Sequence, residues 1–72
     1  MRIGVPKEIT AQESRVGLTP NSVKILVSNG NTVLVESNSG FEAGFDNDQY
    51  ENAGAKILNN PEDIYSDSEI IV

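Results

Sequence analysis

Short apolar segments of this chain alternate with segments that begin like helices, and this alternation constrains the fold more than any other feature. The apolar segments carry β-branched and aliphatic residues at successive positions, as strands covered on both faces do. The other segments begin at a Thr-Pro pair, an aspartate or an Asn-Pro pair, where the first residue can cap a helix. The sequence therefore predicts strands at 2–6, 32–36, 55–58 and 69–72, with helices that start at 20, 47 and 61.

The middle helix has the most complete set of start signals. Asp46 and Gln49 have the spacing of a capping box, and Phe45 and Tyr50 occupy the two positions of a hydrophobic staple. Gly54 then supplies a residue suited to a left-handed helix end. These signals predict a short helix between Asp46 and Gly54.

Residues 24–35, KILVSNGNTVLV, permit two interpretations. An Asn-Gly pair between two β-rich runs is a strong hairpin signal. The spacing of Val23, Leu26 and Val27, however, matches one face of a helix that starts at Thr-Pro and stops at Asn-Gly. We favour the helix because its start, spacing and stop agree. It would connect two neighbouring strands as a right-handed parallel crossover.

Strands that alternate with helices indicate an α/β fold, here an open parallel sheet with helices on both faces and the strand order 3-2-1-4. This plan is Rossmann-like or flavodoxin-like, and ligands of such sheets bind beyond the carboxyl ends of the strands. The 72-residue chain stops inside an apolar strand. We therefore expect residues 1–72 to be an incomplete domain of a longer polypeptide.

Composition argues against several classes of function. A net charge of −6 disfavours nucleic acid and anionic membrane surfaces as partners. The chain has no cysteine or histidine, which removes thiol chemistry, disulfides and the commonest metal ligands. The apolar runs are far too short to cross a membrane, and the first residues do not resemble a signal peptide. We expect no membrane insertion and a cytoplasmic location.

Arg15 stands out because the chain has five basic residues against eleven acidic ones. It follows the first strand, in the stretch KEITAQESRVGLTP, at the edge where ligands of parallel sheets bind. A guanidinium can hold a carboxylate through two parallel hydrogen bonds. Glu13 could orient it, and Lys7 could add a second contact to an anion. Alternatively, Arg15 only pairs with Glu8 or Glu13, which is what residue chemistry alone favours.

The glycine-containing segment 38–45 is predicted to form turns. Its Gly40-x-x-x-Gly44 spacing matches neither a dinucleotide fingerprint nor a P-loop. The first strand is followed by Pro-Lys-Glu rather than Gly-x-Gly, so we expect no nucleotide phosphate here. The aromatic residues are predicted to pack inside rather than to stack on bases; they are Phe41, Phe45, Tyr50 and Tyr65.

Several motifs resemble a known family signature. They are GVPKE, QESRVGLTP and SVKILVSNG, followed by VLVE and YENAGAKI. Together they resemble the N-terminal region shared by alanine dehydrogenase and the alpha subunit of proton-translocating nicotinamide nucleotide transhydrogenase, and the likeness covers nearly the whole chain. GVPKEI, and AGF before an acidic helix start, are closer to alanine dehydrogenase. The departures from the family pattern are Gln12, Gly17 where alanine is usual, Asn38-Ser39 and Glu42.

The resemblance implies the N-terminal part of the substrate domain of an NAD-dependent alanine dehydrogenase, which interconverts L-alanine with pyruvate and ammonia. In such enzymes the arginine that matches Arg15 binds the substrate carboxylate, and we add Glu13 and Lys7 as supports. The family's catalytic lysine, its histidine and its NAD-binding domain would follow Val72. Residues 1–72 are therefore expected to hold no catalytic residue, cofactor site or metal and to be inactive alone. We expect the full-length protein to be a homo-oligomer.

Two alternatives stay open. The first is the transhydrogenase alpha subunit, which keeps this fold without alanine chemistry. The second is a non-catalytic acidic interaction module, in which Arg15 forms only a structural ion pair.

Overall fold

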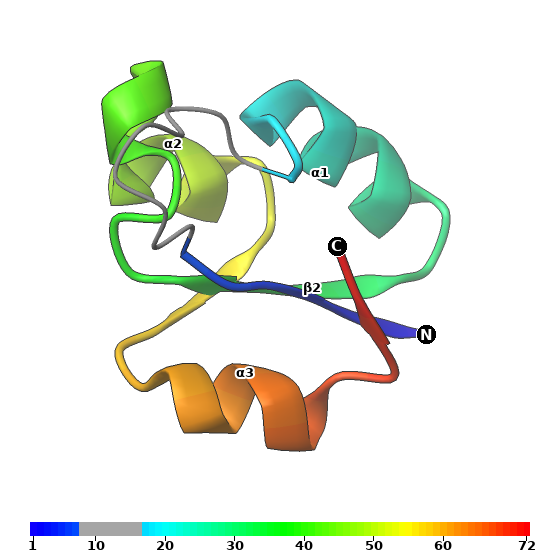
Figure 1. Ribbon diagram of the computed structural model, residues 1–72. Coiled ribbons are helices and arrows are strands. Elements are labelled where there is room, and N and C mark those ends of the chain that lie inside the picture. Colours follow the sequence, from blue (N-terminus) through cyan, green and yellow to red (C-terminus); the bar gives the residue numbers. More distant parts are fainter. Residues whose placement is uncertain (8–16) are drawn as a thin grey trace.

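The chain folds around a parallel sheet with helices on both of its faces (Figure 1). The computed structural model describes residues 1–7 and 17–72. In chain order the elements are β1 (Arg2–Val5), α1 (Pro20–Ser28), β2 (Thr32–Glu36), the 3-10 turn η1 (Phe41–Ala43), α2 (Asn47–Asn52), β3 (Lys56–Leu58), α3 (Pro61–Asp67) and β4 (Ile70–Ile71).

The sheet has the order β3-β2-β1-β4, and each neighbouring pair is parallel. β1 lies inside the sheet and pairs with β2 along its whole length, whereas β4 pairs with β1 through Ile70 and Ile71. The predicted fold class and strand order are confirmed. β1 is one residue shorter than predicted because Pro6 has no N–H to donate to the ladder.

Residues 20–28 are helical, so the hairpin interpretation of this region is wrong. The Ser22 N–H donates to Thr19 Oγ1 at 3.2 Å, which caps the first turn, and Pro20 occupies the first helical position. Gly30 follows the helix with a φ of 92°, a left-handed conformation that glycine adopts without strain. α1 therefore connects the parallel strands β1 and β2, as the crossover interpretation requires.

The start of α2 has the predicted capping box. The Gln49 N–H donates to Asp46 Oδ1, and the Asp46 N–H donates to Gln49 Oε1, both at 2.9 Å. Phe45 and Tyr50 form an edge-to-face pair with ring centroids 6.3 Å apart. Gly54, with a φ of 106°, follows the end of the helix. The capping box and the aromatic pair together fix the position at which α2 begins above the sheet.

The two faces of the sheet are covered unequally. α3 covers one face, where Ile64 is fully buried against the strands and Leu34 is nearly so. α1 and α2 cover the opposite face (Figure 1). The larger core lies there and consists of Ile3, Val5, Val23, Val33, Val35, Tyr50 and Ala55.

The aromatic residues divide into two groups. Phe45 and Tyr50 pack inside, as predicted. Phe41 and Tyr65 are 67% and 57% exposed, so the packing prediction is wrong for these two. Tyr65 follows the buried Ile64 and is turned by about 100° around the helix, so it does not share the buried position of Ile64. Phe41 is the first residue of the short turn η1.

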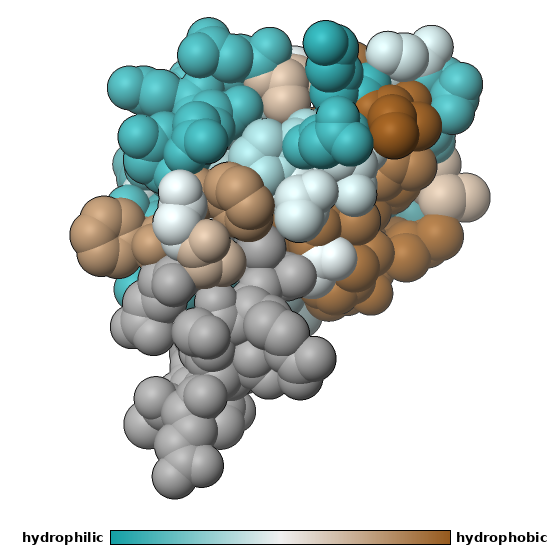
Figure 2. Space-filling view, turned by 90° about the horizontal axis from the view of Figure 1, so that it is seen from above, coloured by the Kyte–Doolittle hydropathy of each residue, from teal (hydrophilic) through white to brown (hydrophobic). Residues whose placement is uncertain are grey.

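The edge strand β4 carries exposed apolar side chains. Ile70, Ile71 and Val72 are each between 41% and 48% exposed. Figure 2 shows an apolar area on the side of the molecule that carries β4. The side edge of the sheet formed by β4 is therefore an apolar surface.

Candidate functional site

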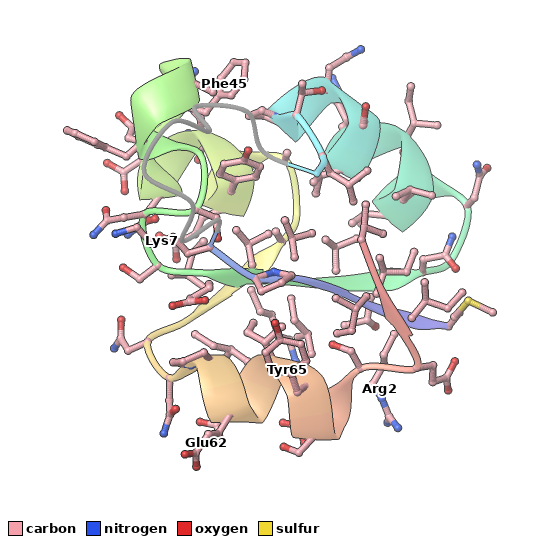
Figure 3. The ribbon with its side chains drawn as sticks, viewed as in Figure 1. Arg2, Lys7, Phe45, Glu62 and Tyr65 are labelled. Atoms are coloured by element: carbon pink, nitrogen blue, oxygen red, sulfur yellow. The ribbon has the colours of Figure 1, made fainter. Side chains whose placement is uncertain are left out.

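The carboxyl ends of β1 and β2 form the edge at which a ligand is predicted to bind. Lys7 lies there, two residues after β1 (Figure 3). Its backbone N–H donates to Glu36 Oε1, at the end of β2, with an N···O distance of 2.8 Å. The Lys7 side chain is exposed. The structure thus brings Lys7 to the predicted edge with its ammonium group directed to solvent, where it can contact an anion.

The other two predicted site residues, Arg15 and Glu13, lie outside the described residues, as does Glu8. The structure describes the chain on either side of them, at Lys7 and at Gly17. Their roles therefore stay predictions that rest on the sequence.

Gly17 lies against the end of the edge strand. A Cβ atom added at Gly17 would be 2.9 Å from the Val72 carbonyl oxygen and 3.0 Å from Val72 Cγ1. Alanine at this position would need one side of this contact to move. Gly17 therefore permits the chain to pass close to β4 just before α1.

Leu18 is held by a residue far away in the sequence. Tyr50 Oη donates to the Leu18 carbonyl oxygen at 2.7 Å, across a sequence separation of 32 residues. Tyr50 is 1% exposed, and burial raises the pKa of its hydroxyl. The sequence predicts a packing role for Tyr50 but does not predict this hydrogen bond. The available signal was general: the hydroxyl of a buried tyrosine usually has a partner.

The segment after β2 is joined to the end of β1 and to α2. The Ser39 hydroxyl, which is buried, donates to the Val5 carbonyl oxygen at 3.2 Å. The Asn38 N–H donates to Asn47 Oδ1 at 2.8 Å, and Asn47 Nδ2 donates to Ser37 Oγ at 3.0 Å. These hydrogen bonds link the end of β1, the segment between β2 and α2, and α2 itself. All of these links lie near the carboxyl ends of β1 and β2.

The glycine-containing segment forms turns, as predicted. The backbone N–H groups of Phe41, Ala43, Gly44 and Phe45 all donate to backbone carbonyls of residues 38 to 41. These N–H groups are therefore occupied and cannot cradle a phosphate. Gly44 has a φ of 93°, which explains a glycine at that position.

A hollow of about 450 Å³ lies on the α3 face of the sheet. Two cations line it, Arg2 and Lys56, together with the carboxylate of Asp67. The sequence does not predict a site at these residues. The remaining lining residues are Thr32, Leu34 and Leu58.

Residues 1–7 and 17–72 hold no cluster of three or more potential metal ligands. Within those same ranges, no helix has the length and apolar character needed to cross a membrane. The chain has no histidine, which is the commonest proton carrier near neutral pH, and no cysteine.

Comparison with known proteins identifies related chains along the whole sequence. Residues 4–72 match the family described as "Alanine dehydrogenase/PNT, N-terminal domain". The alanine dehydrogenase of Bacillus subtilis (strain 168) is 50% identical over 72 residues, which are all of this chain and 19% of that protein. An alanine dehydrogenase of Staphylococcus epidermidis is 52% identical over 58 residues, which are 81% of this chain and 16% of that protein.

Solved structures give the same relationship. A structure titled "L-alanine dehydrogenase" matches with a TM-score of 0.96 and 49% identity, over all of this chain and 20% of the other. A transhydrogenase from Sinorhizobium meliloti matches with a TM-score of 0.88 and 30% identity, over 99% of this chain and 21% of the other. The chain spans about a fifth of the length of these relatives. It belongs to the alanine dehydrogenase/PNT family, as part of that family's N-terminal domain.

Proposed function

We propose that residues 1–72 work as the N-terminal part of the substrate domain of an NAD-dependent alanine dehydrogenase. In this function Arg15 binds the carboxylate of alanine or pyruvate through two hydrogen bonds, Glu13 orients the guanidinium, and Lys7 adds positive charge at the same edge. The nucleotide-binding domain and the groups that transfer hydride and protons belong to other parts of the polypeptide. Residues 1–72 alone bind no NAD and do not turn over alanine.

The observation that carries this proposal is the likeness to alanine dehydrogenase over the full chain, at 50% identity and a TM-score of 0.96. The position of Lys7 at the carboxyl edge of the sheet supports it, because ligands of open parallel sheets bind there. The exposed apolar residues of β4 support a larger domain, since further chain packed on this edge would bury them. The full-length protein acts in the cytoplasm as a homo-oligomer.

The second candidate function is that of a transhydrogenase alpha subunit. The match to a transhydrogenase over 99% of the chain favours it, although at 30% identity and a lower TM-score of 0.88. The fold would be retained and alanine would not be a substrate. The non-catalytic interaction module has no comparable support, because the relatives reported above are named as dehydrogenases and a transhydrogenase.

The test is an assay of the full-length protein with L-alanine and NAD, following NADH formation. We expect reduction of NAD that depends on alanine, and the reverse reaction with pyruvate and ammonium. The 72-residue chain serves as a control and should show neither. No turnover of alanine by a folded full-length protein, together with hydride transfer between nicotinamide nucleotides, would replace our proposal with the transhydrogenase function.

A further inference from the structure

The Asn29-Gly30 pair, which ends α1, has a reactivity of its own. It lies in the turn between α1 and β2, at the amino end of β2 (Figure 1). Both residues are exposed. The pair therefore lies in contact with water, at the opposite end of β2 from the edge where a ligand is predicted to bind.

An asparagine that is followed by glycine can lose its side-chain amide without an enzyme. The Gly30 nitrogen attacks Asn29 Cγ, a C–N bond forms, and the side-chain nitrogen leaves as ammonia together with the proton of the Gly30 N–H. Water then opens the resulting five-membered imide at either of its carbonyls, which gives aspartate or isoaspartate. Glycine favours the attack because it has no Cβ to obstruct its nitrogen and because its backbone is the most flexible.

The folded turn opposes this reaction in two ways. The Gly30 N–H donates to the Val27 carbonyl oxygen at 3.0 Å, so the attacking nitrogen is occupied. Asn29 has a ψ of 11°, which turns the Gly30 nitrogen toward the Asn29 nitrogen and away from Asn29 Cβ. The imide ring needs the Gly30 nitrogen and Cγ on the same side of the Asn29 Cα–C bond. The turn must therefore open before Asn29 can react.

Three further hydrogen bonds hold the turn closed, and all of them end on the Leu26 carbonyl oxygen. The N–H groups of Asn29 and Asn31 each donate to it at 3.1 Å, and Asn31 Nδ2 donates to it at 3.0 Å. Opening the turn at Gly30 displaces Asn31, which is the next residue. The Asn31 side chain thus stabilises the closed turn without belonging to the reactive pair.

We propose that Asn29 is a site of spontaneous deamidation, and that opening of the turn after α1 sets its rate in the folded protein. The product acts on the same turn. Aspartate at position 29 places a negative charge at the carboxyl end of α1, where the helix dipole disfavours it. Isoaspartate adds one carbon to the backbone and displaces the Gly30 N–H from the Val27 carbonyl. Deamidation therefore loosens the end of α1.

The test follows deamidation of the full-length protein by peptide mass spectrometry, at neutral pH, in buffer and in concentrated urea. In urea, Asn29 should react faster than the other asparagines of residues 1–72, because it alone precedes a glycine. In buffer, Asn29 should react more slowly than in urea. Gly30→Ala adds a methyl group beside the attacking nitrogen and should slow the reaction in urea, where the folded turn plays no part.

Asn31→Ala tests the role of the turn, because it removes the hydrogen bond from Nδ2 and keeps the Asn-Gly pair. We expect Asn29 to react about two- to tenfold faster in buffer, the net contribution of one neutral hydrogen bond to the closed state, and at an unchanged rate in urea. The matched control is Asn59→Ala, an exposed asparagine just before α3, which should change neither rate.

The consequence for α1 is tested at position 29 itself. Asn29→Asp is one product of the reaction and should have a lower melting temperature than Asn29→Gln, which keeps a neutral amide. An equal or higher melting temperature in Asn29→Asp would contradict the effect on the helix end.

Two results would overturn the inference itself. Equal rates of Asn29 in buffer and urea, or an unchanged buffer rate in Asn31→Ala, would show that the turn does not control the reaction. No conversion of Asn29 in urea, or a conversion that Gly30→Ala does not slow, would remove the site.

Discussion

Ile64 should carry most of the attachment of α3 to the sheet, and Ile64→Ala tests this. Ile64 is fully buried, and Leu34 is the other large apolar side chain buried on this face. The opposite face has a core of seven buried residues. Because the α3 face has so few buried contacts, the loss of one side chain should loosen α3 more than any other described element.

The expected cost follows from the buried volume. Ile→Ala removes three carbon atoms, which at about 0.8 kcal/mol per buried methylene amounts to roughly 2.4 kcal/mol before any cavity is counted. With a cavity, such changes cost about 2–5 kcal/mol. A chain of 72 residues has a total stability of roughly 4–11 kcal/mol at typical values per residue. The substitution should therefore remove a large fraction of the free energy that holds α3 in place.

Amide hydrogen exchange of the full-length protein, followed in peptides that cover α3 and β4, measures this directly. We expect exchange there to be about 30-fold faster or more in Ile64→Ala, which corresponds to about 2 kcal/mol. Ile25→Ala makes the same chemical change at a site that is 55% exposed and should alter exchange in these peptides little. Unchanged protection in Ile64→Ala, or equal acceleration in both variants, would refute the reasoning.

Three further predictions concern local features. Asp46→Ala should lower stability by about 0.5–2 kcal/mol through loss of the capping box, measured as a lower melting temperature than that of the control Asp48→Ala. Gly4→Ala should cost about 1–3 kcal/mol in thermal unfolding, because the added carbon meets Ser68 and would lie 2.9 Å from Ile64 Cγ2. Burial raises the pKa of Tyr50 above its ordinary 10.0, so the folded state keeps this proton at a pH where the unfolded chain releases it. The contribution of this group to the free energy of unfolding is therefore fully present below pH 10 and is lost as the pH rises above 10. Above pH 10, the melting temperature of Tyr50→Phe should fall less steeply with pH than that of the unmodified protein.

Local signals in the sequence predict much of the fold. Thr19, Asp46 and Asn60 each cap the helix that the sequence assigns to them, because a cap needs only residues two or three positions away. The helical interpretation of 20–28 is confirmed for the same reason. The pairing of β1 with β2 and of β2 with β3 was also predictable, since a short crossover helix places consecutive parallel strands side by side, but this rule does not place β4 beside β1.

Local sequence signals do not predict contacts between residues that are far apart in the chain. The hydrogen bond between Tyr50 and Leu18 spans 32 residues, and nothing in the local sequence of either residue indicates the other. Phe41 was predicted to be buried because it is aromatic, yet the turn around it leaves it 67% exposed. Among the predicted site residues, the structure describes Lys7, which follows the end of β1, while Arg15 and Glu13 lie outside the described residues; the binding roles of all three stay predictions.

The most direct test of carboxylate binding at this edge is the Kd of pyruvate for the full-length protein saturated with NADH. Arg15→Lys keeps the charge but removes the planar pair of donors, so we predict a Kd at least about tenfold higher. Arg2→Lys is the matched control, because Arg2 is exposed and lines the hollow on the α3 face. The pyruvate Kd of this variant should equal that of the unmodified protein. A pyruvate Kd that is unchanged in Arg15→Lys would contradict the assignment of Arg15 as the substrate-binding residue.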